Sequence, residues 1–277
     1  MFTSLRKAAS IGLPIIGLSL LAFSAQADVL PAYNLDFTIL NGTALGPGNT
    51  KEFMGTANPD GWTYVGGGGN LVFVGQGGSD TSNPNPIYAG LTAPPTGGNF
   101  VQADGNPDFE SVFYERITGL TAGQTYSLSF YQAAGQQQGF TGATTEQWIV
   151  SLGTSALTSS TTGGPVDPTY GATGSYSNAD PTASIVKTAL MSTASQGVTP
   201  WQYVTVTLTA DAATQYLSFL AWGDNGSTVN LPPMVFLSGV NQPDVLPEPA
   251  TLALFAIGLL GFGASRMRRP AKHTEEV

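Results

Sequence analysis

Residues 125–132 read Thr-Tyr-Ser-Leu-Ser-Phe-Tyr-Gln, so that large apolar side chains alternate with small polar ones. Successive side chains of a β-strand point to opposite faces, which places Tyr126, Leu128 and Phe130 on one face. The opposite face carries Thr125, Ser127, Ser129 and Tyr131. The same alternation recurs over 203–209, where Val204, Val206 and Leu208 alternate with Tyr203, Thr205 and Thr207. A period of two with one apolar face predicts strands that pack one side on a core.

Similar runs extend on both sides of this stretch, separated by clusters of Gly, Pro, Asn and Asp. Such runs predict strands and such clusters predict turns. The expected strands are 35–40, 62–65, 71–74, 99–102, 111–117, 125–132, 147–152, 203–209, 216–222 and 234–240. About ten short strands are typical of a sandwich or jelly roll. We therefore expect an all-β, jelly-roll-like β-sandwich occupying residues 28–243 as one domain.

Three connecting segments have their own signatures. Residues 117–126 join two expected strands through a Gly-marked turn, with Tyr126 placed where its hydroxyl would brace the turn, a structural role. The glycine-dense segments 66–69 and 75–78 predict hairpin turns, since neither precedes a helix that would make it a phosphate-binding loop. Residues 153–184 are rich in Ser, Thr, Gly and Pro, which predicts a long exposed loop or a flexible excursion.

The first 27 residues have the order of a secretory signal peptide. A basic pair, Arg6 and Lys7, precedes an apolar stretch over 11–23, and the small residues Ala25 and Ala27 follow it. This order predicts cleavage by signal peptidase after Ala27. The alternative is an uncleaved anchor, but the apolar stretch is shorter than the roughly 20 residues of a spanning helix and contains Pro14.

The last part of the chain, 244–277, carries a second three-part signal. Pro247, Glu248 and Pro249 precede an apolar segment over 250–264, which is followed by a basic tail containing Arg266, Arg268 and Arg269. An apolar helix with arginines behind it predicts a membrane anchor whose basic end stays in the cytoplasm, leaving the large middle of the chain outside. An ordinary C-terminal anchor would also fit these features.

This C-terminal pattern resembles the PEP-CTERM sorting signal of Gram-negative bacteria. The resemblance implies recognition by exosortase, a membrane cysteine protease, with cleavage near Pro247, Glu248 and Pro249. It also implies transient anchoring in the inner membrane through 250–264, and export to the cell surface, outer membrane or extracellular matrix. The motif residues would then serve recognition and not catalysis.

The charge of the middle excludes one class of partner. Residues 28–243 hold 3 basic and 14 acidic side chains, a formal charge of −11. Binding of nucleic acid requires Lys and Arg to neutralise phosphates, so we expect no nucleic-acid partner. The same charge is compatible with neutral sugars and with divalent cations.

The available side chains restrict catalysis. The chain has no cysteine, and its only histidine, His273, lies beyond the sorting segment. Nucleophile–histidine pairs and histidine zinc sites are therefore absent from 28–243. The acidic residues Asp104, Asp108, Glu110 and Glu115 would suit a carboxylate-dependent polysaccharide hydrolase only if two of them flanked a cleft. A solvated acidic loop explains them as well, and we expect no catalytic residues.

Two further groups of residues are candidates for binding. Asp104 and Asp108 in one turn, and Asp224 in another, carry the hard oxygen ligands that a structural calcium ion prefers, although Asx turns explain both segments without metal. Trp148 and Trp222 adjoin polar loops, and we consider them as exposed platforms for sugar stacking. Because aromatic side chains also dominate cores, a structural role is the alternative.

The segments 34–37, 58–62 and 99–105, together with the strand at Tyr126, resemble galactose-binding-type jelly rolls of the carbohydrate-binding-module kind. In such domains the last strand often carries an acidic residue that helps to hold calcium, whereas this chain has Ser238 and Gly239 there. We expect a non-catalytic surface or matrix protein associated with exopolysaccharide in biofilm or floc. A polysaccharide hydrolase and an adhesive module for protein partners are the alternatives.

Overall fold

The computed structural model describes residues 27–241 except for 35, 41–42, 45–50, 54–57, 66–70, 75–84, 98, 106–111, 161–174 and 225–231. Within these residues it contains strands and no helix. The strands are β1 (Asp28–Val29), β2 (Ile39–Leu40), β3 (Thr43–Ala44), β4 (Lys51–Phe53), β5 (Trp62–Val65), β6 (Leu71–Val74), β7 (Phe100–Asp104), β8 (Val112–Thr118), β9 (Thr125–Gln136), β10 (Thr144–Gly153), β11 (Leu157–Ser160), β12 (Ser175–Asn178), β13 (Ser184–Lys187), β14 (Met191–Thr193), β15 (Gln202–Thr209), β16 (Thr214–Asp224) and β17 (Pro233–Ser238).

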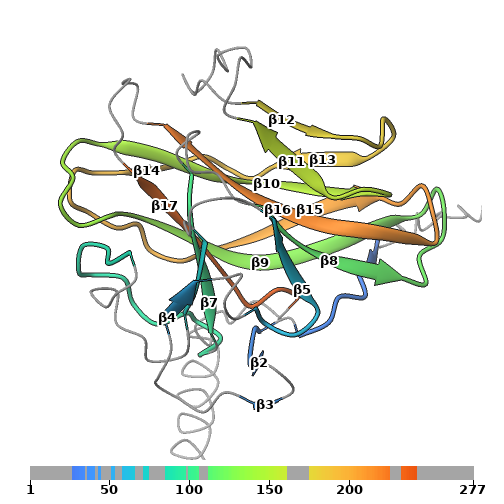
Figure 1. Ribbon diagram of the computed structural model, residues 1–277, viewed down its shortest axis with the longest axis horizontal. Helices are drawn as coiled ribbons and strands as arrows, with labels where there is room; N and C mark the ends of the chain where they lie inside the picture. Colours follow the sequence, from blue (N-terminus) through green and yellow to red (C-terminus); the bar gives the residue numbers. More distant parts are fainter. Residues whose placement is uncertain are drawn as a thin grey trace, which may run out of the picture.

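Two large sheets organise the body (Figure 1). A seven-stranded sheet has the order β1-β9-β17-β7-β6-β4, with β15 also paired to β9. A six-stranded sheet has the order β13-β10-β16-β8-β5, with β14 also paired to β10. From β7 to β10, and again from β15 to β17, successive strands change sheet, an arrangement typical of jelly rolls. The expected all-β, jelly-roll-like sandwich is confirmed.

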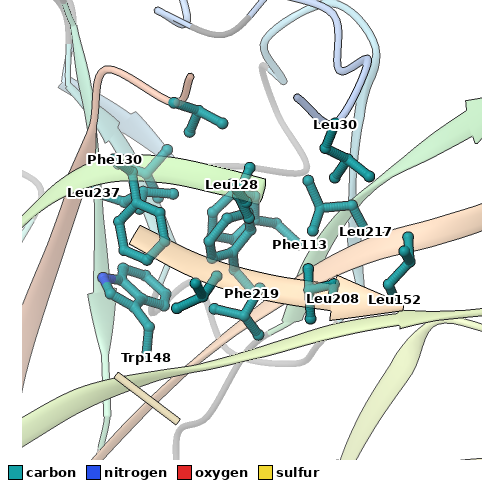
Figure 2. Close-up of a cluster of buried hydrophobic side chains, with 14 of the residues drawn as sticks. Leu30, Phe113, Leu128, Phe130, Trp148, Leu152, Leu208, Leu217, Phe219 and Leu237 are labelled. Atoms are coloured by element: carbon teal, nitrogen blue, oxygen red, sulfur yellow. The ribbon is translucent and has the colours of Figure 1, made fainter. Parts of the chain in front are cut away.

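The main core lies between the two sheets and is rich in aromatic rings (Figure 2). Phe219 of β16 is at its centre, with ring centroids 5.3 Å from Phe113, 5.5 Å from Phe130 and 5.9 Å from Trp148. The Phe113 and Phe219 rings are stacked, whereas Phe130 and Trp148 meet Phe219 edge-on. These aromatic pairs add stabilisation beyond the area that they bury.

Each sheet is also covered in part on its outer face. On the seven-stranded sheet, Phe100, Met234 and Phe236 pack with Ile87 and with the partly buried Trp201. On the six-stranded sheet, Val112, Ile149, Leu220 and Trp222 pack under Leu157 of β11. In Figure 1 the β11–β12 hairpin lies above β10 and β16. This double coverage explains why β7 and β17 are buried at every position.

The turn before β9 has the form that the sequence predicts. The Tyr126 hydroxyl accepts a hydrogen bond of 2.9 Å from the Thr121 backbone N–H, and the tyrosine is 7% exposed. Gly119 and Gly123 adopt φ angles of +81° and +80°, in the left-handed region that glycine populates without strain. The structural role expected for Tyr126 is confirmed.

One expectation about connections is wrong. The segment 153–184 is not one long loop, because β11 and β12 pair within it and Leu157 is 1% exposed. The glycine-dense segments 66–69 and 75–78, expected as hairpin turns, lie outside the described residues.

The strand predictions differ from the structure mainly at their ends. The expected strands at 62–65 and 71–74 coincide with β5 and β6, whereas 125–132 continues to Gln136 in β9. The expected strand at 35–40 is reduced to β2 at its last two residues. The short strands β1, β3, β4, β13 and β14 were not expected.

Candidate functional site

The outer face of β9 and β15 carries paired hydroxyl groups. The two strands are antiparallel, and their register places serine and threonine side chains opposite one another in three pairs. We call these six residues the hydroxyl ladder: Thr125 with Thr209, Ser127 with Thr207, and Ser129 with Thr205. The β15 members are exposed and the β9 members are half-buried. Hydrogen bonds of 3.1 Å and 3.0 Å join the hydroxyls of the first and third pairs.

A pair of tyrosines closes one end of the hydroxyl ladder. Tyr131 and Tyr203 are the next opposed residues on the same face, and their ring centroids lie 5.1 Å apart at a tilted angle. Tyr131 is buried, whereas Tyr203 is half-buried. Trp201 lies just beyond, half-buried, and its indole N–H donates to the Thr92 carbonyl at 2.8 Å. The face therefore passes from hydroxyls to aromatic rings.

The chemistry of this face follows from its residue types. The hydroxyls recur about every 6.6 Å along each strand, and opposed residues lie about 5 Å apart. Each hydroxyl can donate one hydrogen bond and accept two. The six ladder residues are serines and threonines, whose hydroxyl side chains carry no charge. Such a face can hydrogen-bond a neutral polyhydroxylated chain and offer it an aromatic surface.

Sequence reasoning found the parts of this face but not the site. The alternation over 125–132 and 203–209 identifies both polar faces correctly. These strands pair across 84 residues of sequence at Thr125 and Thr209. Neither segment alone indicates that pairing. Matching serine and threonine spacing in two strands is the only sequence signal that could have suggested the ladder.

Neither tryptophan expected to form an exposed platform is exposed. Trp148 is 0% exposed in the main core, where its indole N–H donates to the Phe236 carbonyl at 3.1 Å. Trp222 is 1% exposed on the outer face of the six-stranded sheet, where the Tyr176 ring meets it edge-on at 5.1 Å. These predictions are wrong because the core takes up Trp148 and the β11–β12 hairpin covers Trp222.

Asp104 and Glu115, the two described carboxylates of the four considered for hydrolysis, do not share a cleft. Asp104 is buried on the outer face of β7, since its neighbour Ala103 belongs to the main core. Glu115 is buried on the inner face of β8, which it shares with Phe113 and Ile117. The two residues therefore lie in different sheets and on different sides of the core. Asp108 and Glu110 lie outside the described residues.

The two segments considered for calcium meet at one end of the sandwich. The Gly223 N–H donates to the Gly105 carbonyl at 2.8 Å, so the backbone beside Asp104 adjoins the backbone beside Asp224. The approach is close, because a Cβ on Gly105 would lie 2.8 Å from the Gly223 nitrogen. Among the described residues, no group of three or more acidic or histidine side chains could hold a metal ion. Asp108 and the side chain of Asp224 are outside that description.

The position at which the resemblance places a calcium-binding carboxylate is used differently here. Ser238 is 0% exposed, and its hydroxyl donates to the Asn99 carbonyl at 2.7 Å. Gly239 follows with a φ angle of +61°. In the described part of the chain, these residues join the end of β17 to the start of β7 and supply no anionic ligand.

Two buried carboxyl groups have unusual protonation. Burial raises the pKa of Glu146 to about 8, against the lowering effect of hydrogen bonds from the Thr144 and Thr193 hydroxyls. Burial likewise raises the pKa of Glu115 to about 8, opposed by the Tyr33 backbone N–H that donates to Oε1 at 2.6 Å. Both groups hold a proton at neutral pH. Sequence reasoning did not single out Glu146.

The expected processing residues lie largely outside the described part of the chain. Ala27 is its first residue, and Ala25 precedes it. Pro247, Glu248, Pro249, Arg266, Arg268, Arg269 and the expected spanning segment 250–264 all follow its last residue, Asn241. Among the described residues, no helix is long and apolar enough to cross a membrane.

Comparison with protein families identifies the C-terminal segment. Residues 245–269 match the PEP-CTERM protein-sorting motif, which confirms the resemblance seen in Pro247, Glu248 and Pro249. No curated protein sequence matches the chain.

Several solved structures are similar to this chain at low identity. TmCBM61, solved with β-1,4-galactotriose, is 11% identical with a TM-score of 0.34, over 76% of this chain and 95% of that one. The K1 cleaved adhesin domain of Lys-gingipain from Porphyromonas gingivalis W83 is 17% identical with a TM-score of 0.32, over 69% and 95% of the two chains. The family 11 carbohydrate-binding module from Clostridium thermocellum, solved with a mixed-linked tetrasaccharide, is 11% identical with a TM-score of 0.30, over 65% and 87%. At these values, we transfer no ligand or activity from them.

Proposed function

We propose that the mature protein is a non-catalytic protein of the cell surface or extracellular matrix that binds neutral polysaccharide along the hydroxyl ladder. The observation that carries this proposal is the ladder itself, with three opposed hydroxyl pairs ending on Tyr131 and Tyr203. Association with exopolysaccharide in biofilm or floc is the role that follows from such binding outside the cell.

The C-terminal motif supports the extracellular part of the proposal. A PEP-CTERM motif at residues 245–269 indicates a secreted protein that is membrane-anchored at its C-terminus during sorting and is processed by exosortase. In our proposal signal peptidase first cleaves after Ala27, and 250–264 then anchors the chain transiently in the inner membrane. The body would reach the cell surface, outer membrane or extracellular matrix of a Gram-negative bacterium.

Charge supports a neutral partner over an anionic one. The region 28–243 carries 14 acidic and 3 basic side chains, and protonation of Glu115 and Glu146 removes only two of the negative charges. A polyanion such as nucleic acid would be repelled at low ionic strength. A neutral polysaccharide would contact the uncharged hydroxyls and the Tyr131–Tyr203 pair. Its binding would not require ions to neutralise charge.

The placement of the described carboxylates Asp104, Glu115 and Glu146 supports a non-catalytic role. Hydrolysis of a glycosidic bond generally uses two carboxyl groups roughly 5–10 Å apart on either side of the bond. Asp104 and Glu115 lie in different sheets, and the buried Glu146 faces the core from β10. Release of new reducing ends from a bound polysaccharide would instead support the hydrolase alternative.

The test is co-sedimentation of the purified mature protein with insoluble neutral matrix polysaccharide. We expect the triple variant Thr205→Val, Thr207→Val and Thr209→Val to bind at least about tenfold more weakly, because valine keeps the shape and strand propensity but cannot hydrogen-bond. Thr63→Val, an exposed threonine of β5 in the other sheet, is the matched control. Equal binding by the triple variant and the parent protein would exclude the ladder as the site. Sedimentation only with a protein fraction of the matrix would instead support an adhesive module.

A further inference from the structure

The two ends of the described body meet along one edge of β9. β15 pairs with one edge of β9 over Thr125–Gln132. β17 pairs with the other edge over Tyr131–Gln136, and β1 continues it in parallel at Tyr126 and Ser127. The start and the end of the body therefore share one edge of a single strand.

Asn241 fills the gap between β17 and β1. Its backbone N–H donates to the Ser129 carbonyl at 2.5 Å, and its side-chain oxygen accepts from the Ser129 N–H at 3.2 Å. Its side-chain amide donates to the Leu30 carbonyl at 2.6 Å, across 211 residues of sequence. The residue has a φ angle of +53°, a conformation that asparagine tolerates better than most residues. One side chain thus bonds both to β9 and to the N-terminal segment.

The N-terminal segment is built into the sandwich and does not merely lie on it. The Leu30 N–H donates to the Ser127 carbonyl at 2.9 Å, and the Leu30 side chain is 1% exposed in the main core. Three residues later, the Tyr33 N–H donates to the buried carboxyl of Glu115. Phe37 is fully buried against Trp62 at 5.4 Å between ring centroids. Docking of this segment therefore completes the core.

Both expected processing sites adjoin this junction. Asp28 directly follows Ala27, and only residues 242–244 separate Asn241 from the sorting motif at 245. Those residues can span at most about 14 Å from Asn241 to Val245. Asp28 lies opposite Tyr126 and Asn241 bonds to Ser129, so the two ends lie about 10 Å apart along β9.

We propose that Asn241 acts as a clamp between the two ends of the body. Docking of the N-terminal segment around Leu30 and ordering of the chain at Asn241, just after β17, are then one cooperative event. The bond from Asn241 to the Leu30 carbonyl exists only when both segments are in place, so each stabilises the other, and this coupling is reciprocal. The consequence for sorting rests on the proposed export route. The motif begins at most about 14 Å from Asn241, which bonds to the N-terminal segment only in a chain whose residues after Ala27 have docked.

The coupling can be measured by amide hydrogen exchange on the full chain in detergent, read by residue. In Asn241→Gly, which keeps the positive φ angle and removes only the side-chain bonds, we expect the Leu30 amide to exchange at least about tenfold faster. The control is Gln196→Gly, an exposed residue with a φ angle of +62° away from the junction. It should leave the Leu30 amide unchanged.

The reciprocal experiment perturbs the other end. Leu30→Ala removes a buried side chain of the N-terminal segment, and we expect the Asn241 and Ser129 amides to exchange at least about fivefold faster. Val29→Ala changes the neighbouring residue, which is 64% exposed, and should not affect them. If Asn241→Gly and Leu30→Ala each loosened only their own segment, the clamp would be excluded. Neither measurement uses polysaccharide or exosortase, so failure of the clamp and failure of the proposed function are separate results.

Discussion

At the scale of single residues, the buried carboxyl groups give the body an unusual dependence on pH. An unfolded glutamate ionises near its ordinary pKa of about 4.3, whereas burial raises the pKa of Glu146 and of Glu115 to about 8. Between these values the folded chain binds more protons than the unfolded chain. Stability is therefore greatest below about pH 4.5 for these two groups and falls as the pH rises to about 8.

We expect Glu146→Gln to reduce this loss of stability. The amide cannot ionise, so Glu146 no longer makes the free energy of unfolding depend on pH. That contribution is at most about 1.4 kcal/mol per pH unit. Urea unfolding at pH 5, 6.5, 8 and 9 measures the effect. Asp28→Asn, which changes an exposed carboxyl group, is the control and should retain the parent slope. A parent protein as stable at pH 9 as at pH 5 would contradict the burial of these carboxyl groups.

Asp180 acts in the opposite direction at low pH. The Thr154 N–H donates to its carboxylate at 2.7 Å and the Thr182 hydroxyl at 2.6 Å, and these bonds lower the pKa of Asp180. The stability that they contribute is present above the ordinary aspartate pKa and is lost as the pH falls through the lowered value. We expect Asp180→Asn to weaken the body at pH 5 but to remove part of the further loss on acidification. Thermal unfolding between pH 2 and pH 5 tests this.

Tyr126 illustrates a residue whose role the sequence predicts. Its place after a glycine-marked turn is sufficient, because a turn of fixed length brings its hydroxyl to a backbone N–H. We expect Tyr126→Phe to lower the free energy of unfolding by about 1–2 kcal/mol, because the Thr121 N–H loses its acceptor. Tyr114→Phe, on a half-buried ring at the sheet surface, should change it by less than about 0.5 kcal/mol in the same urea titration. Equal effects of the two substitutions would remove the bracing role.

At the scale of elements, the β11–β12 hairpin changes the character of the six-stranded sheet. The Leu157 N–H donates to the Ser218 hydroxyl at 3.1 Å, and the Leu157 side chain is buried with Leu220 and Trp222. The hairpin thereby converts an outer sheet face into a second core. This is why strands such as β10 are buried on both faces and do not display the alternation expected of a half-exposed strand.

We expect Leu157→Ala to lower the free energy of unfolding by about 2–4 kcal/mol, the usual cost of emptying a leucine site in a core. Thr158→Ala, at the exposed neighbouring position, should have little effect. Chemical unfolding followed by tryptophan fluorescence measures both substitutions. The fluorescence of the folded Leu157→Ala variant should also shift to longer wavelength, because Trp222 becomes hydrated. A cost below about 0.5 kcal/mol would mean that the hairpin does not pack on the sheet.

Prediction from sequence succeeded for strands with one solvent-exposed face and failed for residues buried on both faces of a sheet. Period-two alternation identifies β9 and β15 and assigns their faces correctly, because one face of each meets solvent. It cannot assign Trp148 or Trp222, because a buried aromatic and an exposed platform have the same local sequence. The long Ser-, Thr- and Gly-rich segment conceals β11 and β12, whose strand character depends on packing against the sheet beneath them.

At the scale of the whole molecule, the strand order follows from contacts that no local pattern contains. β1 and β17 share an edge of β9 although they lie at opposite ends of the body, and Asn241 connects them across 211 residues. The sequence predicts the fold class from the number of strands and the absence of helical periodicity. It does not predict which strands pair, and for that reason neither the hydroxyl ladder nor the clamp could be derived from it.

Net charge and the neutral ladder together predict how polysaccharide binding responds to salt. Region 28–243 carries a formal charge of −11, while the six ladder residues carry none. Raising NaCl from 50 mM to 500 mM shortens the Debye length from about 14 Å to about 4 Å and screens the body's long-range field. If hydroxyls and aromatic rings hold a neutral chain, the dissociation constant should change by less than about twofold. An acidic polysaccharide is the matched comparison, and it should bind more weakly at 50 mM than at 500 mM NaCl because like charges repel. Binding of the neutral chain that weakened steeply with salt would contradict a contact made by uncharged hydroxyls and aromatic rings.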